Sequence, residues 1–229
     1  MEKGNILIME IHISVRSLVE FILRSGDIDN RKAAFSPDAM QEGGRIHRMI
    51  QRRMGSNYHA EVGLSYTYQT KNYDIVIDGR ADGIIIESDV TIDEIKGTYH
   101  DLIKMKQAVP VHLAQAKCYA YIYATQNQLE SIRVRMTYCH LETEEIRYFH
   151  HDYMYAELKE WFDEVMEQYE KWSDYSFEWQ NMRQASIKEL TFPFEYREGQ
   201  KELATYVYQT IYHKRKLFIE APTGVGKTI

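Results

Sequence analysis

Residues 75–99 read IVIDGRADGIIIESDVTIDEIKGTY, and this stretch carries the strongest structural signal in the chain. Two runs of β-branched apolar residues, Ile75–Ile77 and Ile84–Ile86, predict strand, and Val90–Lys96 predicts another strand after the polar turn Glu87–Asp89. Strands joined by so short a turn pair antiparallel. Residues 75–99 therefore predict a β-hairpin.

Two carboxylates stand out in this hairpin: Asp82, in a Gly-bounded kink of the first strand, and Glu94 in the second. Side chains alternate along a strand, so Glu94 and Lys96 project from one face, and Asp93 and Ile95 project from the other. Antiparallel pairing then places Asp82 roughly opposite Glu94. Two negative charges held this close repel each other, and a bound divalent cation would offset this repulsion. Carboxylate oxygens suit Mg²⁺ or Mn²⁺, so the hairpin predicts a metal site.

Four short motifs follow one another along the chain. Asp82 followed by residues 94–96, EIK, resembles the D…(D/E)xK signature of the PD-(D/E)XK nuclease superfamily. Residues 43–47, GGRIH, resemble the G-x-x-x-H helix motif of its RecB-like branch, and residues 115–119, QAKCY, resemble the Q-x-x-x-Y helix motif. The resemblance extends over residues 13–138. It implies an α/β fold with a restriction-endonuclease-like core, in which helices flank a mixed β-sheet.

The resemblance also implies a set of metal ligands. In this family a divalent cation activates water for attack on a phosphodiester bond. Carried over residue by residue, the ligands are His47, Asp82, Glu94 and the Ile95 carbonyl, for one or two Mg²⁺ or Mn²⁺ ions. The alternative for His47 is an ordinary core histidine on the apolar face of its helix.

Three further residues complete the expected catalytic set, which also contains Asp82 and Glu94. The resemblance implies that Lys96 orients the attacking water or stabilises the developing oxyanion. It implies that Gln115 and Tyr119 support the site and contact the substrate strand. These two residues lie one turn apart on a predicted helix, where ordinary helix surface is the alternative.

The expected DNA-binding residues form two basic groups. The first lies around His47 and contains Arg45, Arg48 and Arg52. The second lies in the loop-like stretch 97–110 and contains Lys104 and Lys106. The lysines border the predicted site, but they fit a solvated loop equally well. The net charge of -6 gives no general support for nucleic-acid binding, so the prediction depends on these local groups. Eighteen tyrosines offer stacking surfaces for bases, although most of them fit ordinary packing.

Composition is that of an ordinary globular protein. The chain has 229 residues, of which 44% are hydrophobic and 27% charged. It contains no apolar run of membrane-spanning length and no N-terminal signal-peptide pattern, so we expect a cytoplasmic protein without membrane contact. Its two cysteines, Cys118 and Cys139, fit a reducing compartment. An iron–sulfur cluster needs about four cysteine ligands, so we expect none, in contrast to some RecB-like nucleases.

Periodicity and end signals predict the other elements. A strand is predicted within residues 6–13, followed by a helix that Ser14 or Ser17 caps, with Ser17 and Glu20 as a capping box and Gly26 at its end. Further predicted elements are a helix from Ser36-Pro37 to Met54, a strand at 64–70 with a turn at 71–72, a helix at 111–125, strands at 132–138 and 145–149, an exposed hairpin end rather than a metal site at 150–152, and a helix at 153–182.

A second resemblance begins near Phe194. Residues 195–213 predict a helix and residues 217–220 a strand, and residues 221–228, APTGVGKT, resemble a Walker A loop with Ala for the first Gly. Together they are similar to the start of a DinG/XPD-type superfamily 2 helicase. A Walker A loop binds nucleotide phosphates through backbone N–H groups and a lysine, so the resemblance implies an incomplete ATP site made of Gly224, Gly226, Lys227 and Thr228.

We therefore predict two parts, a nuclease domain at residues 1–183 and a linker with the start of a helicase ATPase domain at residues 184–229. Because the chain ends at Ile229, directly after the loop, we expect it to be the front of a longer nuclease–helicase of DNA repair or processing. The expected partners are DNA, with single-stranded or flapped DNA favoured by analogy, and a helicase domain in cis that uses ATP. The alternative is a catalytically inactive nucleic-acid-binding module that tethers a helicase.

Overall fold

The structure is a computed structural model that describes residues 9–24, 37–191 and 193–220. The Walker A stretch, Gly26, Ser36 and residues 6–8 of the first predicted strand lie outside the described residues. Internal contacts divide the chain into two compact units, Met1–Tyr175 and Ser176–Ile229. The first unit contains the β-sheet and every residue predicted for the nuclease site.

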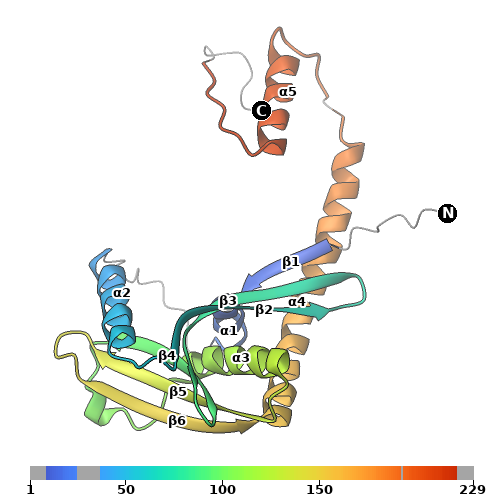
Figure 1. The fold of residues 1–229 in the computed structure, drawn as a ribbon. Coiled ribbons are helices and arrows are strands. Elements are labelled where there is room, and N and C mark those ends of the chain that lie inside the picture. The colour runs from blue at the N-terminus through green and yellow to red at the C-terminus, as the bar shows by residue number, and fades with distance from the viewer. Residues whose placement is uncertain (1–8, 25–36, 192, 221–229) are drawn as a thin grey trace. The chain divides into compact units, whose positions relative to one another are not determined.

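A mixed sheet forms the centre of the first unit (Figure 1). Its six strands are β1 (Met9–Ser14), β2 (Tyr58–Gln69), β3 (Tyr73–Ile86), β4 (Val90–Thr98), β5 (Ser131–His140) and β6 (Ile146–Met154). The strand order is β1-β3-β4-β5-β6, and β2 pairs with β3 outside this path. The pairs β1–β3 and β4–β5 are parallel, and the pairs β2–β3, β3–β4 and β5–β6 are antiparallel.

Strand β3 pairs with three other strands. β2 covers one edge over almost the whole length of β3, whereas β1 pairs with residues 73–78 and β4 with residues 83–86 on the other edge. Residues 79–82 separate these two ladders, so the β1/β4 edge opens at Asp82. The predicted hairpin is confirmed, and its Gly83–Asp93 pair places Asp82 opposite Glu94.

The helices are α1 (Val15–Ile22), α2 (Pro37–Arg52), α3 (Pro110–Asn127), α4 (Tyr155–Glu189) and α5 (Gln200–Tyr212), with a short 3₁₀ turn at Leu102–Lys104. Helix α3 packs on β2, β3, β4, β5 and α1, and it is buried on several sides. Its alanines at 114, 116, 120 and 124 are buried, so the helix backbone can lie close to the sheet.

Aromatic packing joins α3, α4 and the sheet. The Phe162 ring of α4 stacks on Tyr121 of α3 at 4.2 Å between centroids, and both rings meet Tyr66 of β2 edge to face. Further along α4, the Tyr73 hydroxyl of β3 donates a hydrogen bond of 2.7 Å to Asp174 and lies 3.0 Å from the Ser173 hydroxyl. These contacts fix α3, whose motif residues face the hairpin, relative to β2 and β3.

The structure confirms Ser14, one of the two predicted caps of α1, and corrects the predicted capping box, hairpin end and last strand. Ser14 caps α1 by accepting a hydrogen bond from the Ser17 N–H, and Glu20 pairs with Arg16 instead of forming a capping box. The hairpin end predicted at residues 150–152 is part of β6, because β5 and β6 stay paired as far as Met154. Residues 217–220 form no strand in the described part of the chain, since no other segment pairs with them.

The second unit holds the C-terminal end of α4 and helix α5. Gly199 caps α5 with a φ of 77°, a conformation that glycine adopts without strain. Among the described residues of this unit, α5 buries no side chain, and Tyr208, Ile211 and Tyr212 are largely exposed. Across the described residues of both units, no helix has an apolar stretch long enough to cross a membrane.

Candidate active site

Helix α2 and strand β3 bring His47 and Asp82 together. Ile46 and Ile50 of α2 are buried against Ile95, which fixes the helix on the hairpin. His47 Nδ1 lies 3.2 Å from Asp82 Oδ1, and Asp82 Oδ2 accepts a hydrogen bond of 2.7 Å from the Ile95 N–H. Burial lowers the pKa of His47, but the hydrogen bond and charge of Asp82 outweigh that effect, so the net shift is upward.

Glu94 lies beside this pair and is only 1% exposed. Its Oε1 pairs with Lys96 Nζ at 2.8 Å, and Lys96 donates in turn to Gln115 Oε1 of α3 at 3.1 Å. The second oxygen, Oε2, is buried and has no hydrogen-bond partner among the described residues. Burial, with the negative charge of Asp82 as the next cause, raises the pKa of Glu94 well above the usual carboxyl range. A divalent cation would supply the partner that Oε2 lacks.

Tyr119 lies one turn after Gln115 and reaches the open edge of β3. A Cβ on Gly79 would come within 2.7 Å of the Tyr119 hydroxyl oxygen, so a glycine is needed there for the tyrosine to fit. Burial, followed by the charge of Glu94, raises the pKa of Tyr119 to about 12. Tyr119 therefore keeps its proton near neutral pH and remains a hydrogen-bond donor.

Strand β5 fixes the start of α3. The Tyr138 hydroxyl accepts a hydrogen bond of 2.9 Å from the Val109 N–H and lies 3.1 Å from His112 Nδ1. Burial and the charge of Lys96 lower the pKa of His112 to about 4, so this imidazole is neutral at physiological pH. The anchored helix start sets the position of Gln115 one turn later.

Asp93 lies on the other side of β4, as the strand periodicity predicts. It is fully buried and accepts hydrogen bonds of 2.9 and 2.8 Å from the Arg135 guanidinium. The Thr137 and Tyr58 hydroxyls also donate to its carboxylate. A side chain on Gly83 would overlap the Tyr58 ring. This network holds β2, β4 and β5 together directly behind the site.

Sequence reasoning missed one acidic residue of the site, Glu61 of β2. His47, Glu61 and Asp82 each offer a ligand atom, and these three atoms lie within 4.8 Å of one another. Glu61 belongs to none of the four motifs and is 21 positions away from Asp82 along the chain, so no local pattern predicts it as a site residue. The β2–β3 register, which pairs Ala60 with Gly83, brings it beside Asp82.

The described residues fit a divalent cation. Asp82, Glu94 and His47 supply two carboxylates and an imidazole, and Glu94 Oε2 is buried without a hydrogen-bond partner in the part of the chain that the structure describes. Oxygen and nitrogen ligands of this kind suit Mg²⁺ or Mn²⁺. Ile95 lies between Glu94 and Lys96 and binds Asp82 through its N–H, so its backbone borders the same site.

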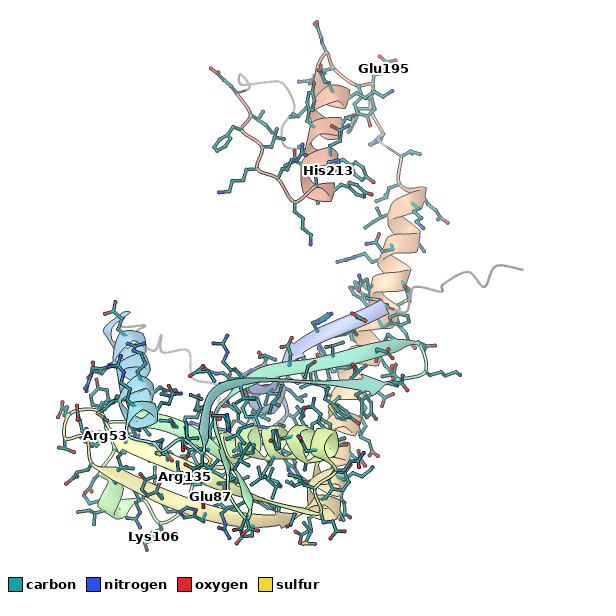
Figure 2. All side chains as sticks on the ribbon, viewed as in Figure 1. Arg53, Glu87, Lys106, Arg135, Glu195 and His213 are labelled. Carbon is teal, nitrogen blue, oxygen red and sulfur yellow. The ribbon has the colours of Figure 1, made fainter. Side chains whose placement is uncertain are left out.

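The predicted DNA-binding residues differ in their exposure and in their ion pairs. Arg45 pairs with Glu42 at 2.8 Å and with Glu144 at 2.6 Å, so it ties α2 to the β5–β6 turn. Arg48, Arg52 and Lys106 are exposed, and Lys104 lies 3.5 Å from Asp101. Figure 2 shows Arg53, just after α2, and Lys106, in the loop before α3, at separate places on the first unit.

Comparison with known proteins finds a sequence relative over a short stretch and several similar solved structures. No family model matches the chain. A stretch of 44 residues, 19% of the chain, is 52% identical to the probable ATP-dependent helicase MJ0942 of Methanocaldococcus jannaschii, and it spans 7% of that protein's length. The crystal structure of LHK-Exo in complex with dAMP has a TM-score of 0.50 and 14% identity, covering 76% of this chain and 94% of that chain.

The crystal structure of SSO0001 has a TM-score of 0.47 and 17% identity, covering 69% of this chain and 76% of that chain. At 14% identity, the similarity to LHK-Exo shows a shared fold and no more. The expected α/β class, a mixed sheet flanked by helices, is confirmed at that level.

The raised pKa of Glu94 predicts the pH dependence of stability in the metal-free protein. The folded state binds the Glu94 proton more tightly than the unfolded state, so the free energy of unfolding falls as pH rises above the ordinary Glu pKa. The raised pKa of His47 acts in the same direction. Glu94→Gln should therefore flatten the decline of Tm with pH, measured in EDTA by circular dichroism. Equal slopes for wild type and variant would contradict the assigned burial of Glu94.

Proposed function

We propose that the first unit is a metal-dependent DNA nuclease of the PD-(D/E)XK superfamily, RecB-like branch, that hydrolyses phosphodiester bonds. The observation that carries the proposal is the convergence of Asp82, Glu94 and Lys96 from one hairpin on His47 of α2 and Gln115 of α3. The fold shared with LHK-Exo, an exonuclease by its name, supports the same reading.

The site residues have different roles in the proposed hydrolysis. When bound, Mg²⁺ or Mn²⁺ lowers the pKa of a water ligand and neutralises charge on the phosphate. Asp82, Glu94, His47 and the Ile95 carbonyl would hold one or two such ions. Lys96 is held between Glu94 and Gln115, where its ammonium group can donate to the oxyanion that develops on the phosphate. The protonated Tyr119 hydroxyl supplies a further donor at the open edge of β3.

We infer that this module acts beside a helicase in a longer protein of DNA repair or processing. The stretch that is similar to a probable ATP-dependent helicase supports this inference. The Walker A-like sequence of residues 221–228 supports it as well. ATP would bind through Gly224, Gly226, Lys227 and Thr228 in that longer protein. Strand separation by such a partner would deliver single-stranded or flapped DNA to the nuclease site.

The proposed activity is tested on end-labelled linear and circular single-stranded DNA, with Mg²⁺, with Mn²⁺ and with EDTA. Cleavage of the linear strand only in the presence of metal is the expected result. Products from the circle would establish endonuclease action, because a circle has no end. Binding without cleavage under every metal condition would overturn the nuclease proposal in favour of an inactive binding module.

Lys96→Met should lower the maximal cleavage rate by about 10²–10³-fold, the range for removal of one oxyanion donor. DNA affinity and Mn²⁺ affinity should change little, because the ammonium acts where charge develops in the transition state. Single-turnover cleavage at saturating enzyme separates the two effects. A weaker affinity with an unchanged maximal rate would make Lys96 a binding residue.

A further inference from the structure

We propose that Glu61 is a metal ligand, and that with His47 and Asp82 it forms an outer cation subsite next to the inner subsite of Asp82 and Glu94. This inference rests on the proposed nuclease function and specifies its metal requirement. The ligand is a divalent cation that accepts one imidazole nitrogen and two carboxylate oxygens.

The β2–β3 register places Glu61 at the site. Ala60 pairs with Gly83 and Val62 with Ala81, so Glu61 lies opposite Asp82, yet these two residues are not a ladder pair. The Asp82 carbonyl instead accepts a hydrogen bond from Gln51, and the Tyr58 hydroxyl oxygen lies 3.4 Å from it. This interruption of the ladder lets the Glu61 carboxylate, His47 and Asp82 approach within 4.8 Å.

Glu61 holds an unusual backbone conformation in the middle of a strand. Its φ is 55°, in the left-handed region that residues with a side chain adopt at a cost. Strain of this kind is kept where the surroundings or the function require one side-chain position. Here the required position is the one beside Asp82.

Helix α2 and strand β3 hold the Glu61 carboxylate in place before a cation binds. Gln51, one turn after His47 on α2, donates to Glu61 Oε1 at 3.0 Å, and Arg80 Nη1 lies 3.4 Å from Glu61 Oε2. Partners that orient a ligand in this way are usual around metal sites. Gln51 also binds the Asp82 carbonyl, so one amide positions both carboxylate residues.

A second observation, at the adjoining inner subsite, also points to a bound cation. Glu94 is 1% exposed and its Oε2 has no hydrogen-bond partner in the described residues, while Oε1 is paired with Lys96. His47 Nδ1 lies 3.2 Å from Asp82 Oδ1, and the Gly83–Asp93 pair of the hairpin places Asp82 opposite Glu94, so Asp82 lies between the outer and the inner groups. Asp82 can therefore contribute an oxygen to each subsite.

The two subsites differ in chemistry. The inner one offers carboxylate oxygens, which suit Mg²⁺ and Mn²⁺ alike. The outer one includes an imidazole nitrogen, a ligand that Mn²⁺ and other transition metals accept more readily than Mg²⁺ does. Occupancy of the outer subsite should therefore favour Mn²⁺ over Mg²⁺.

The test is a Mn²⁺ titration of the metal-stripped 229-residue chain without DNA, in which electron paramagnetic resonance measures free Mn²⁺. Glu61→Gln should lose one class of Mn²⁺ site or weaken it at least tenfold. Glu142→Gln, which changes an exposed carboxylate on the β5–β6 turn, should titrate like wild type. Glu61→Gly is the second variant, because glycine relieves the positive φ and should raise Tm while removing the ligand.

If both Glu61→Gln and Glu61→Gly bind Mn²⁺ with the same number of sites and the same affinities as wild type, the outer subsite is overturned. If wild type cleaves DNA in that case, the proposed nuclease function stands and only this inference fails. A wild-type chain that neither binds Mn²⁺ nor cleaves DNA would overturn both. The expected cleavage result is a tenfold higher Mn²⁺ requirement for the two Glu61 variants.

Discussion

Asp82→Ala or Glu94→Ala should lower metal-dependent cleavage by at least about 10³-fold, since a catalytic metal supplies several kcal/mol and each 1.36 kcal/mol is a tenfold change in rate. Both carboxylates lie at the open edge of β3, and Glu94 has a buried oxygen without a partner in the described chain. The variants should remain folded, because removing either carboxylate relieves repulsion in the metal-free protein. Cleavage is measured on labelled single-stranded DNA with Mn²⁺, and folding by circular dichroism.

Asp89→Ala is the matched control for these variants. Asp89 lies in the turn of the same hairpin and is exposed, so its loss should leave the cleavage rate unchanged. Metal-dependent cleavage at the wild-type rate by either the Asp82 or the Glu94 variant would remove that carboxylate from the site.

Asp93→Asn should destabilise the protein by about 3–5 kcal/mol, the usual cost of removing one partner of a buried ion pair. Asp93 is fully buried and receives both hydrogen bonds of the Arg135 fork, so the substitution leaves a guanidinium that is only 14% exposed without its counter-charge. The free energy of unfolding from urea titration measures this effect.

Strand β5 offers a matched control for that prediction. Arg133 pairs with Asp152 at 2.6 Å, but both side chains are exposed. Asp152→Asn should therefore cost at most about 1 kcal/mol. If Asp93→Asn and Asp152→Asn lower the free energy of unfolding by the same amount, the Asp93–Arg135 pair does not stabilise the sheet as a buried ion pair.

Local patterns predicted the hairpin and the relative positions of its charged residues. Strand periodicity placed Glu94 and Lys96 together, and a 2.8 Å ion pair joins them. Antiparallel pairing across the turn placed Asp82 opposite Glu94. Both results depend only on residues close in the sequence, where the period of two and the length of the turn leave few alternatives.

The contacts that sequence reasoning missed join residues far apart in the chain. Asp93 meets Arg135, and Glu61 approaches Asp82, because of the strand order β2-β3-β4-β5, which no local period specifies. The prediction of a strand at residues 217–220 is wrong for the same reason. A strand requires a pairing partner, and the local sequence does not show whether one is present. The sequence pattern allows either Ser14 or Ser17 to cap α1, and Ser14 is the cap because it ends strand β1, which pairs with β3 as far as this residue.

We propose that the hairpin at residues 75–99 forms the site of a cation-dependent phosphodiester hydrolase, and metal add-back tests this dependence. Wild-type protein stripped with EDTA is mixed with labelled single-stranded DNA, and Mn²⁺ is then added in excess over the chelator. We predict no cleavage before the addition, cleavage after it, and an immediate stop when EDTA is restored. Cleavage that continues at the same rate in EDTA, or none at any Mn²⁺ concentration, would contradict the claim.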